Sequence, residues 1–349
     1  MSPQGARSRT GRGLLVLGAL AVLLGSCAVA LGVGSVDVPV TRVLAVLARR
    51  AGAGDFDVTL LEDQLVWQLR LPRILGAVAV GAVLASCGAV LQSLTRNDLA
   101  DPFLLGVSSG AGVGAVSVIV LGMGVGGLAA GAVLPAAAFA GALAALAAVL
   151  LVASAGGGAL RPHRTVLAGV AVAHLCGAYT SVVVIMHGQG DAARRVLAWT
   201  LGSLAGLRWG SALVLVGAAV VALVWFLAYA ERLDAFAFGE TSARSLGVPV
   251  SATRWVLMVG TALVTATTVA YAGAIGFVGL VVPHLVRPLV GSRHRALLPA
   301  SAVAGAVLLV WADTAARSLV DGQEVPIGAL TALIGVPVLV WLMARRTVA

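Results

Sequence analysis

The sequence contains no lysine, so its basic character is due to arginine alone. The 349 residues include 23 basic and 14 acidic ones, which gives a formal net charge of +9. A nucleotide-binding P-loop has the pattern GxxxxGK[ST], in which the lysine contacts the phosphates. This chain therefore cannot hydrolyse ATP through a P-loop. If ATP drives its function, the ATPase is a different subunit.

Charged residues are scarce: they make up 11% of the chain, whereas hydrophobic residues make up 60%. A soluble globular domain has about 25% charged residues. Several windows of about 20 residues carry no charge, which is long enough for a helix to cross about 30 Å of hydrocarbon. The composition excludes an ordinary soluble domain and predicts an all-α polytopic membrane protein. The arginines are scattered among short connections, so no nucleic-acid partner is expected, and membrane lipid surrounds the chain.

Cysteines and histidines give no sign of a metal or redox site. The three cysteines lie in apolar segments without CxxC spacing, which is typical of small packing residues. The five histidines are spread over separate segments and show no HExxH pairing. We expect neither a metal nor another cofactor.

Apolar runs separated by short polar segments predict ten transmembrane helices. They are 13–34, 72–94, 103–122, 128–154, 165–187, 209–230, 255–275, 276–290, 297–317 and 326–344. The first run follows three arginines and also fits a cleaved signal, but it is long enough to span the membrane. The eighth is short, and a hairpin that dips into the membrane is as reasonable there as a full crossing. The chain is interpreted as one transmembrane domain, 1–349.

An even number of spans places both termini on one side of the membrane. Most of the arginines then lie on that side, and the positive-inside rule makes it the cytoplasm. This predicts a cytoplasmic tail at 1–12, an outer segment at 35–71 and a long cytoplasmic segment at 231–254. The outer segment contains VPVTRVLAVLARR, whose helical spacing of apolar residues predicts a helix lying on the membrane surface.

Two patterns in the apolar part are compared with functional sites. GVSSG at 106–110 matches the GxSxG of serine nucleophiles, but it opens an apolar helix after DPFLL, which favours a close-packed helix entry. Asp313 is an ionisable group inside a predicted span, and such groups face the bundle interior or a water-filled cavity. Asp313 and Arg317 are also spaced i,i+4 for a structural ion pair. The sequence leaves both interpretations of Asp313 open.

The cytoplasmic segment contains GETSARSLGVPV at 239–250, a polar run between two apolar stretches. Thr241 or Ser242 is suited to cap the start of a helix. Gly247 can take the left-handed conformation that ends one, with Pro249 two residues beyond. We predict a helix of about one and a half turns. Because a plain connection needs only about 2–8 residues, we interpret this helix as a docking element for a cytoplasmic partner.

Four stretches of the sequence carry a resemblance to a known family. They are WQLRLPRILGAVAVGAVLASCGAVLQSLTRNDLADPFLLGVSSGAGVG at 67–114, AGAIGFVGLVVPHLVR at 272–287, HRALLPASAVAGAVLLVWADTAAR at 294–317 and EVPIGALTALIGVPVLVWL at 324–342. They resemble the motifs of permease subunits of ABC importers for iron–siderophores, haem and cobalamin, the FecCD/BtuC type. The resemblance covers nearly the whole chain beyond residue 60. It implies the type II importer architecture, with ten spans per permease subunit.

The family's assembly defines the partners that the resemblance implies. Two permeases, either a homodimer or a heterodimer with a similar permease, surround a central path. Two ATP-binding subunits lie on the cytoplasmic side, and a substrate-binding protein docks outside. GETSARSLGVPV matches the segment that couples the permease to the ATPase. This match implicates Glu240, Ser242, Ala243, Arg244, Leu246 and Gly247.

Other site residues follow from the same resemblance. Arg70, Arg73 and Arg317 match outer-face arginines that pair with acidic residues of the binding protein. Pro162 and His163 stand where the cobalamin member has a small-residue inner gate, and Pro-His departs from that pattern. Asp98 stands in place of the family's proline in RNPLAD, although Asn-Asp also favours a turn.

The sequence therefore predicts a permease subunit in a bacterial cell membrane that is not itself an enzyme. Ferric siderophore is the expected cargo, and cobalamin or haem are the alternatives. An ion-coupled secondary transporter is the alternative from a different class. That transporter would need intramembrane carboxylates beyond Asp313, and none is well placed.

Overall fold

The computed structural model describes residues 9–34, 36–123, 130–155, 162–320 and 322–346. Within these ranges the chain is helical apart from its connections, and no β-strand occurs. Six helices are long and apolar enough to cross a membrane, and four shorter apolar helices accompany them in the described part. Each of these helices coincides with a predicted span. The all-α polytopic fold is therefore confirmed.

The N-terminal part consists of a span and a surface helix. The first helix, α1 (Arg9–Gly32), begins inside the predicted tail, of which residues 1–8 lie outside the described ranges. The next helix, α2 (Val40–Arg50), buries Val43 and Val46 on one face and ends in two arginines. This is the amphipathic helix that the sequence predicts in the outer segment.

The predicted boundary between the outer segment and the second span is wrong. The helix begins at Leu60 and runs without a gap through α3 (Leu60–Asp63), the π-helical stretch η1 (Gln64–Arg70) and α4 (Leu71–Thr95). A capping box between Thr59 and Glu62 starts it. The N–H of Leu71 bonds to the carbonyl of Val66, five residues back. A wider π turn thus precedes Pro72, which has no N–H to continue the α-helical pattern.

The remaining helices follow the predicted order with shifted ends. They are η2 (Pro102–Leu105, a 3₁₀ turn), α5 (Val107–Leu121), α6 (Ala130–Ser154), α7 (Pro162–His187), α8 (Ala192–Thr200), α9 (Trp209–Ala228), α10 (Ala230–Phe236), α11 (Glu240–Ser245), α12 (Val250–Ala272), α13 (Val278–Val290), α14 (His294–Ala316) and α15 (Ile327–Arg346). The sequence does not predict α8 and α10, because both are too short to register as apolar spans.

The short eighth segment forms α13, which has 13 residues. At 1.5 Å per residue it extends about 20 Å, too short to cross about 30 Å of hydrocarbon alone. Positive φ angles at Gly273 (70°) and Phe277 (67°) separate it from α12. However, α12 begins beside α11, and α14 begins at His294, which bonds to Asp234 at the same end of the bundle. The stretch 273–277 and α13 together therefore return the chain across the bundle, so this segment is a crossing and not a hairpin.

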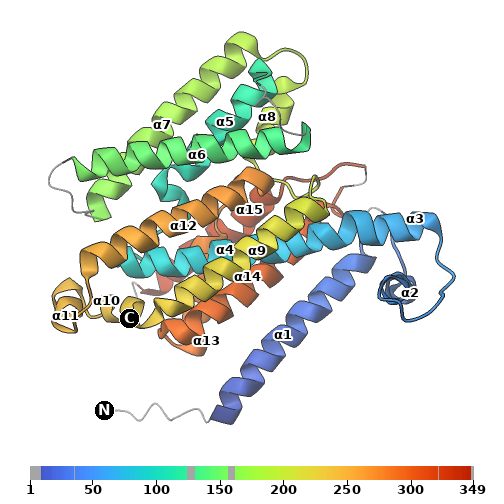
Figure 1. Ribbon diagram of the computed structural model, residues 1–349, viewed down its shortest axis with the longest axis horizontal. Coiled ribbons are helices and arrows are strands. Elements are labelled where there is room, and N and C mark those ends of the chain that lie inside the picture. Colours follow the sequence, from blue (N-terminus) through green and yellow to red (C-terminus); the bar gives the residue numbers. More distant parts are fainter. Residues whose placement is uncertain (1–8, 35, 124–129, 156–161, 321, 347–349) are drawn as a thin grey trace.

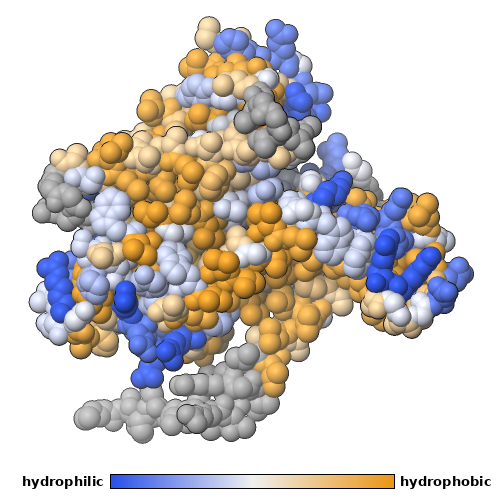
Figure 2. Space-filling view, viewed as in Figure 1, coloured by the Kyte–Doolittle hydropathy of each residue, from blue (hydrophilic) through white to orange (hydrophobic). Residues whose placement is uncertain are grey.

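The helices form two groups around α4 (Figure 1). In one group α5 contacts α6, α7 and α8; in the other α4 contacts α9, α13 and α14, and α12 touches both groups. Figure 2 shows hydrophobic residues over the middle of the visible face, and hydrophilic ones gathered near α10–α11, near α2–α3 and, at the top, near the connection of α7 and α8. The molecule thus presents two polar ends separated by an apolar surface, as expected for a protein that crosses a membrane.

Glycines allow the central helices to approach closely. A Cβ added to Gly81 of α4 would lie 2.2 Å from the carbonyl oxygen of Gly305 in α14, and one added to Gly88 would lie 1.8 Å from that of Gly279 in α13. Such distances leave no room for a side chain. Backbone contact between small residues supplies the van der Waals packing that drives helix association in lipid.

We expect Gly81→Val to destabilise the protein by about 1–3 kcal/mol or more, because the new side chain must push α4 and α14 apart. The matched control is Gly217→Val on α9, where an added Cβ would meet no atom within 4 Å. Thermal unfolding of the two purified variants in detergent is the measurement. Equal losses for both variants would contradict the packing explanation.

Candidate functional site

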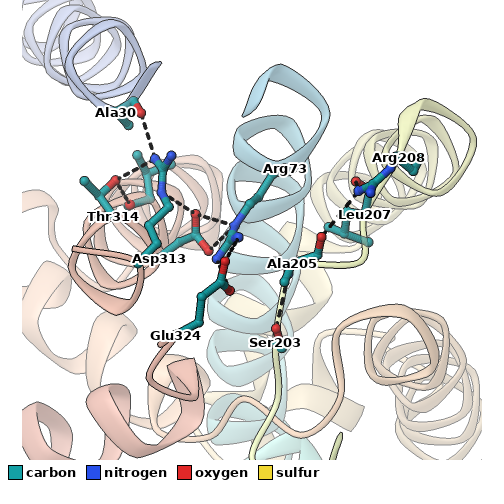
Figure 3. A network of polar contacts seen from close by, with 11 residues as sticks. Ala30, Arg73, Ser203, Ala205, Leu207, Arg208, Asp313, Thr314 and Glu324 are labelled. Carbon is teal, nitrogen blue, oxygen red and sulfur yellow. Dashed lines mark hydrogen bonds and ion pairs between the residues drawn. The ribbon is translucent and has the colours of Figure 1, made fainter. Parts of the chain in front are cut away.

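The three arginines predicted to dock a binding protein lie together at the polar end that carries α2 and α3. Arg73 of α4 is the centre of the group (Figure 3). Its Nε lies 2.9 and 3.1 Å from the carboxylate oxygens of Asp313 in α14. Its two terminal nitrogens donate to the two carboxylate oxygens of Glu324 at 2.8 and 3.0 Å. One guanidinium group therefore joins α4, α14 and the connection before α15.

The other two arginines bind the end of α1. Arg70 donates to the carbonyls of Leu31 (2.7 Å) and Gly32 (3.0 Å), and also to that of Val36. Arg317 donates to the carbonyl of Ala30 at 2.7 Å. Ala30, Leu31 and Gly32 belong to the last turn of α1, whose carbonyls have no partner within the helix and where positive charge is also favourable. The arginines thus fix α1 to the rest of the bundle.

The carboxylate of Asp313 lies between the guanidinium groups of Arg73 and Arg317. Its second carboxylate oxygen lies 3.5 Å from Nε of Arg317, which is the i,i+4 pair that the sequence predicts. Asp313 is only 1% exposed, and Arg70, Arg73 and Arg317 are 4%, 8% and 7% exposed. Of the two interpretations left open for Asp313, the structure supports the structural ion pair. The three arginines are engaged by this chain's own oxygen atoms, which the sequence does not predict.

At the opposite polar end, the predicted helix in GETSARSLGVPV is present as α11 (Figure 1). Its predicted cap is wrong: the N-cap residue is Gly239 with φ 94°, and neither Thr241 nor Ser242 caps it. A glycine tolerates this backbone conformation, so a polar cap is not needed for the turn. The predicted end is confirmed, since Gly247 has φ 79° and Val248 N–H bonds to the carbonyl of Ala243 at 3.0 Å.

The residues of α11 differ in what they offer to a partner. Ala243 is fully buried beneath the helix and Glu240 is half-buried. Ser242, Arg244 and Gly247 are exposed, and so is Leu246, at 68%. Because single exposed leucines are common on protein surfaces, Leu246 points to a binding surface only together with the short, firmly held helix that carries it.

Ion pairs hold this segment to the bundle. Glu240 accepts from Arg254 of α12 at 2.6 Å. Asp234 of α10 lies 2.6 Å from Nδ1 of His294 in α14, and Nε2 of His294 lies 2.6 Å from Oγ of Ser93 in α4. The segment that carries α11 is therefore connected by polar contacts to α12 and α14, and through His294 to α4.

Asp98, which replaces the family's proline, forms an ion pair with Arg287 of α13 at 2.7 Å. This cross-link secures the turn after α4. Further along the turn, Asp101 accepts from the N–H of Phe103 at 2.8 Å. Burial raises the pKa of Asp101 to about 6, since its remaining surroundings are apolar.

The residues suggested for an inner gate lie at the start of α7. Pro162 is its first residue, and its side chain lies outside the described part; His163 is exposed. The gate assignment therefore stays a prediction. In GVSSG, Gly110 packs against Gly141 of α6, where an added Cβ would lie 2.4 Å from the carbonyl oxygen. This confirms the close-packed helix entry. Among the described residues, no group of three metal-ligating side chains comes together.

The fold and its two polar ends define a polytopic membrane protein. Residues 21–345 match the model of the FecCD transport family. The chain belongs to this family, and it is the permease subunit of an ABC importer of the FecCD/BtuC type.

Curated relatives agree with this assignment. The chain is 42% identical over 283 residues to the vitamin B12 import system permease protein BtuC of Salmonella paratyphi A, covering 81% of this chain and 84% of that protein. The protein of the same name in Salmonella typhimurium is 41% identical over 283 residues, again 81% of this chain and 84% of that protein.

Solved structures show the same fold. One, described as an inward-facing conformation of a metal-chelate type ABC transporter, is 30% identical and superposes with a TM-score of 0.82 over 95% of this chain and 99% of that one. A second, PsaBC from Streptococcus pneumoniae in complex with Fab, is 19% identical with a TM-score of 0.56 over 76% and 87%. The second likeness concerns the fold alone.

We expect Asp313→Asn to reduce the free energy of unfolding by about 3–5 kcal/mol, because it leaves two buried guanidinium groups without their shared carboxylate. Glu324→Gln is the matched control: its side chain is 46% exposed, so the loss should stay near or below about 1 kcal/mol. Thermal unfolding in detergent measures both. Similar losses would show that burial does not set the strength of these pairs.

Proposed function

We propose that this chain forms half of the membrane part of a metal-chelate importer, paired with a second copy or with a similar permease. Two ATP-binding subunits dock at the end that carries α11, and a substrate-binding protein docks at the end that carries Arg73. The observation that carries this proposal is α11 itself: a short helix fixed to the bundle by buried contacts, with an exposed apolar Leu246.

The contacts of α11 are suited to transmitting force. Because Ala243 is buried and Glu240 is paired with Arg254, a push on the exposed face moves the whole segment rather than one side chain. Asp234 passes that movement to α14 and α4 through His294. ATP binding in the partner subunits then shifts the balance between inward- and outward-facing states, by binding one state more tightly than the other. No covalent chemistry takes place in this chain.

The orientation of the chain in the membrane follows from the assignment of α11 as the ATPase contact. The ATPase side is the cytoplasm, so α11 lies at the cytoplasmic face and the arginine cluster at the outer face of a bacterial cell membrane. An even number of spans then keeps both termini in the cytoplasm, in agreement with the distribution of arginines.

The cargo is a metal chelate. Similarity at 42% identity to permeases named for vitamin B12 import supports cobalamin, and the metal-chelate description of the structural neighbour is compatible with ferric siderophore, the cargo that the sequence predicts. Haem is the third candidate. The binding protein, rather than this chain, selects among them.

An ion-coupled secondary transporter is disfavoured by the surroundings of Asp313. A coupling carboxylate must exchange its ion or proton with water during each cycle. Asp313 is 1% exposed and is bonded to Arg73, with Arg317 close by. It is a fixed structural charge.

We expect Leu246→Asp to lower ATPase co-purification and chelate uptake by about tenfold or more, because the new carboxylate would be buried without a partner in the contact. Leu60→Asp, at a 75% exposed leucine of the opposite end, is the matched control and should change neither. Uptake of labelled cobalamin and of a labelled ferric siderophore is measured in cells that produce the permease with its ATPase and binding protein.

The chelate that the wild type accumulates and the Leu246→Asp variant does not is the cargo. Normal co-purification and normal uptake in the variant would show that α11 is not the ATPase contact.

We expect Arg73→Lys to weaken docking of the binding protein by about tenfold or more, because lysine keeps the charge beside Asp313 but loses the bidentate fork for a carboxylate. Arg208→Gln, at an exposed arginine before α9, is the control and should have a smaller effect. Affinity is measured with purified binding protein and the permease–ATPase complex in nanodiscs. Unchanged docking of the Arg73→Lys variant would remove Arg73 from the docking site.

A further inference from the structure

The outward-facing side of Arg73 is already occupied. A guanidinium group has five N–H donors arranged as a planar fork that binds a carboxylate through two parallel hydrogen bonds. The Nε of Arg73 is taken by Asp313, and its two terminal nitrogens are both taken by Glu324 (Figure 3). A carboxylate arriving from outside therefore finds no free fork on this arginine, because the two N–H groups that remain, one on each terminal nitrogen, point in different directions.

We propose that Glu324 is an internal competitor for docking: its carboxylate holds Arg73 in the free permease and is replaced by a carboxylate of the substrate-binding protein. This inference rests on the proposed role of Arg73 in docking. It makes the first step of docking an exchange of one carboxylate for another.

The two carboxylates on Arg73 differ in how easily they leave. Asp313 is 1% exposed and lies near Arg317 as well, so its departure would strand buried charge. The Glu324 side chain is 46% exposed and already touches water. A half-exposed ion pair is weakened by the solvent that screens it, and its carboxylate can return to water at little cost. Glu324 is therefore the replaceable partner.

Release of Glu324 does not require its backbone to move. The flanking chain is held by other bonds: Val325 N–H to the carbonyl of Ala316 at 2.9 Å, and Gly328 N–H to that of Leu201 at 2.9 Å. These bonds keep the connection before α15 in place while the side chain turns outward. The exchange needs only a change of one side-chain rotamer, which is fast compared with helix movement.

The exchange also determines when the positive charge of Arg73 becomes available to a partner. In the free permease Arg73 is paired with Asp313 and Glu324, and Arg317 lies near Asp313, so these two buried positive charges are balanced within the chain. Glu324 thus masks a cationic site until a carboxylate of matching geometry arrives. Anions that bind through a single oxygen replace only one of its two bonds, which favours a partner's carboxylate over simple anions.

The test measures the affinity of the purified binding protein encoded with this permease for the permease–ATPase complex in nanodiscs. We expect Glu324→Gln to tighten docking about two- to five-fold, because the competing charge is gone while the shape is kept. Asp55→Asn is the matched control: it removes one negative charge from an exposed site of the same outer end and should leave the affinity unchanged.

The Arg73→Lys background shows whether Glu324 acts through Arg73. There the gain from Glu324→Gln should shrink, since the fork for which two carboxylates compete is absent. Unchanged or weaker docking of the Glu324→Gln variant, or an equal gain from Asp55→Asn, would overturn the exchange. If Arg73→Lys docks normally, it is the proposed docking role of Arg73 that fails.

Discussion

The structure depends on how charge is paired where α4 meets α14. Hydrocarbon offers no water to solvate a guanidinium group, so a buried arginine is stable only beside a carboxylate or carbonyl oxygens. Arg73 finds Asp313 on the facing helix, 240 residues along the chain. Gly81 and Gly305 bring the same two helices into backbone contact. The ion pair and the glycine contact together set the distance between these helices.

Both polar ends use basic side chains bound to oxygen atoms, but the contacts hold different parts of the structure. At the end that carries α2 and α3, arginine side chains bind the last carbonyls of α1 and so attach a peripheral span to the core. At the end that carries α11, Arg254 and His294 hold this short surface helix and its segment through Glu240 and Asp234. The first arrangement fixes a span in place, whereas the second leaves an exposed face available to a partner. Position in the bundle, rather than residue type, decides which role a charge has.

Local patterns in the sequence predicted much of this fold. Apolar runs located the spans, and Gly247 located the end of α11, because hydropathy and left-handed glycines act over short stretches of chain. The start of the helix at Leu60 was not predictable in this way. Pro72 suggests that a helix begins there, whereas a π turn carries the helix through from the preceding residues. Nor was the pairing of Arg73 with Glu324, which joins residues 251 positions apart. The RLPR and ADTAAR motifs place charged residues in apolar surroundings, which indicates only that these charges need partners, not which residues those partners are.

The unbroken helix that carries Arg73 also carries Ser93. Twenty residues of regular α-helix separate them, about 30 Å. Arg73 is tied to Asp313 near one end of α14, and Ser93 to His294 at the other. A regular α-helix is stiff over this length, so α4 cannot tilt at one of these contacts without also moving at the other. The two helices are thus joined near both of their ends, so a tilt of either one changes the contacts at both polar ends.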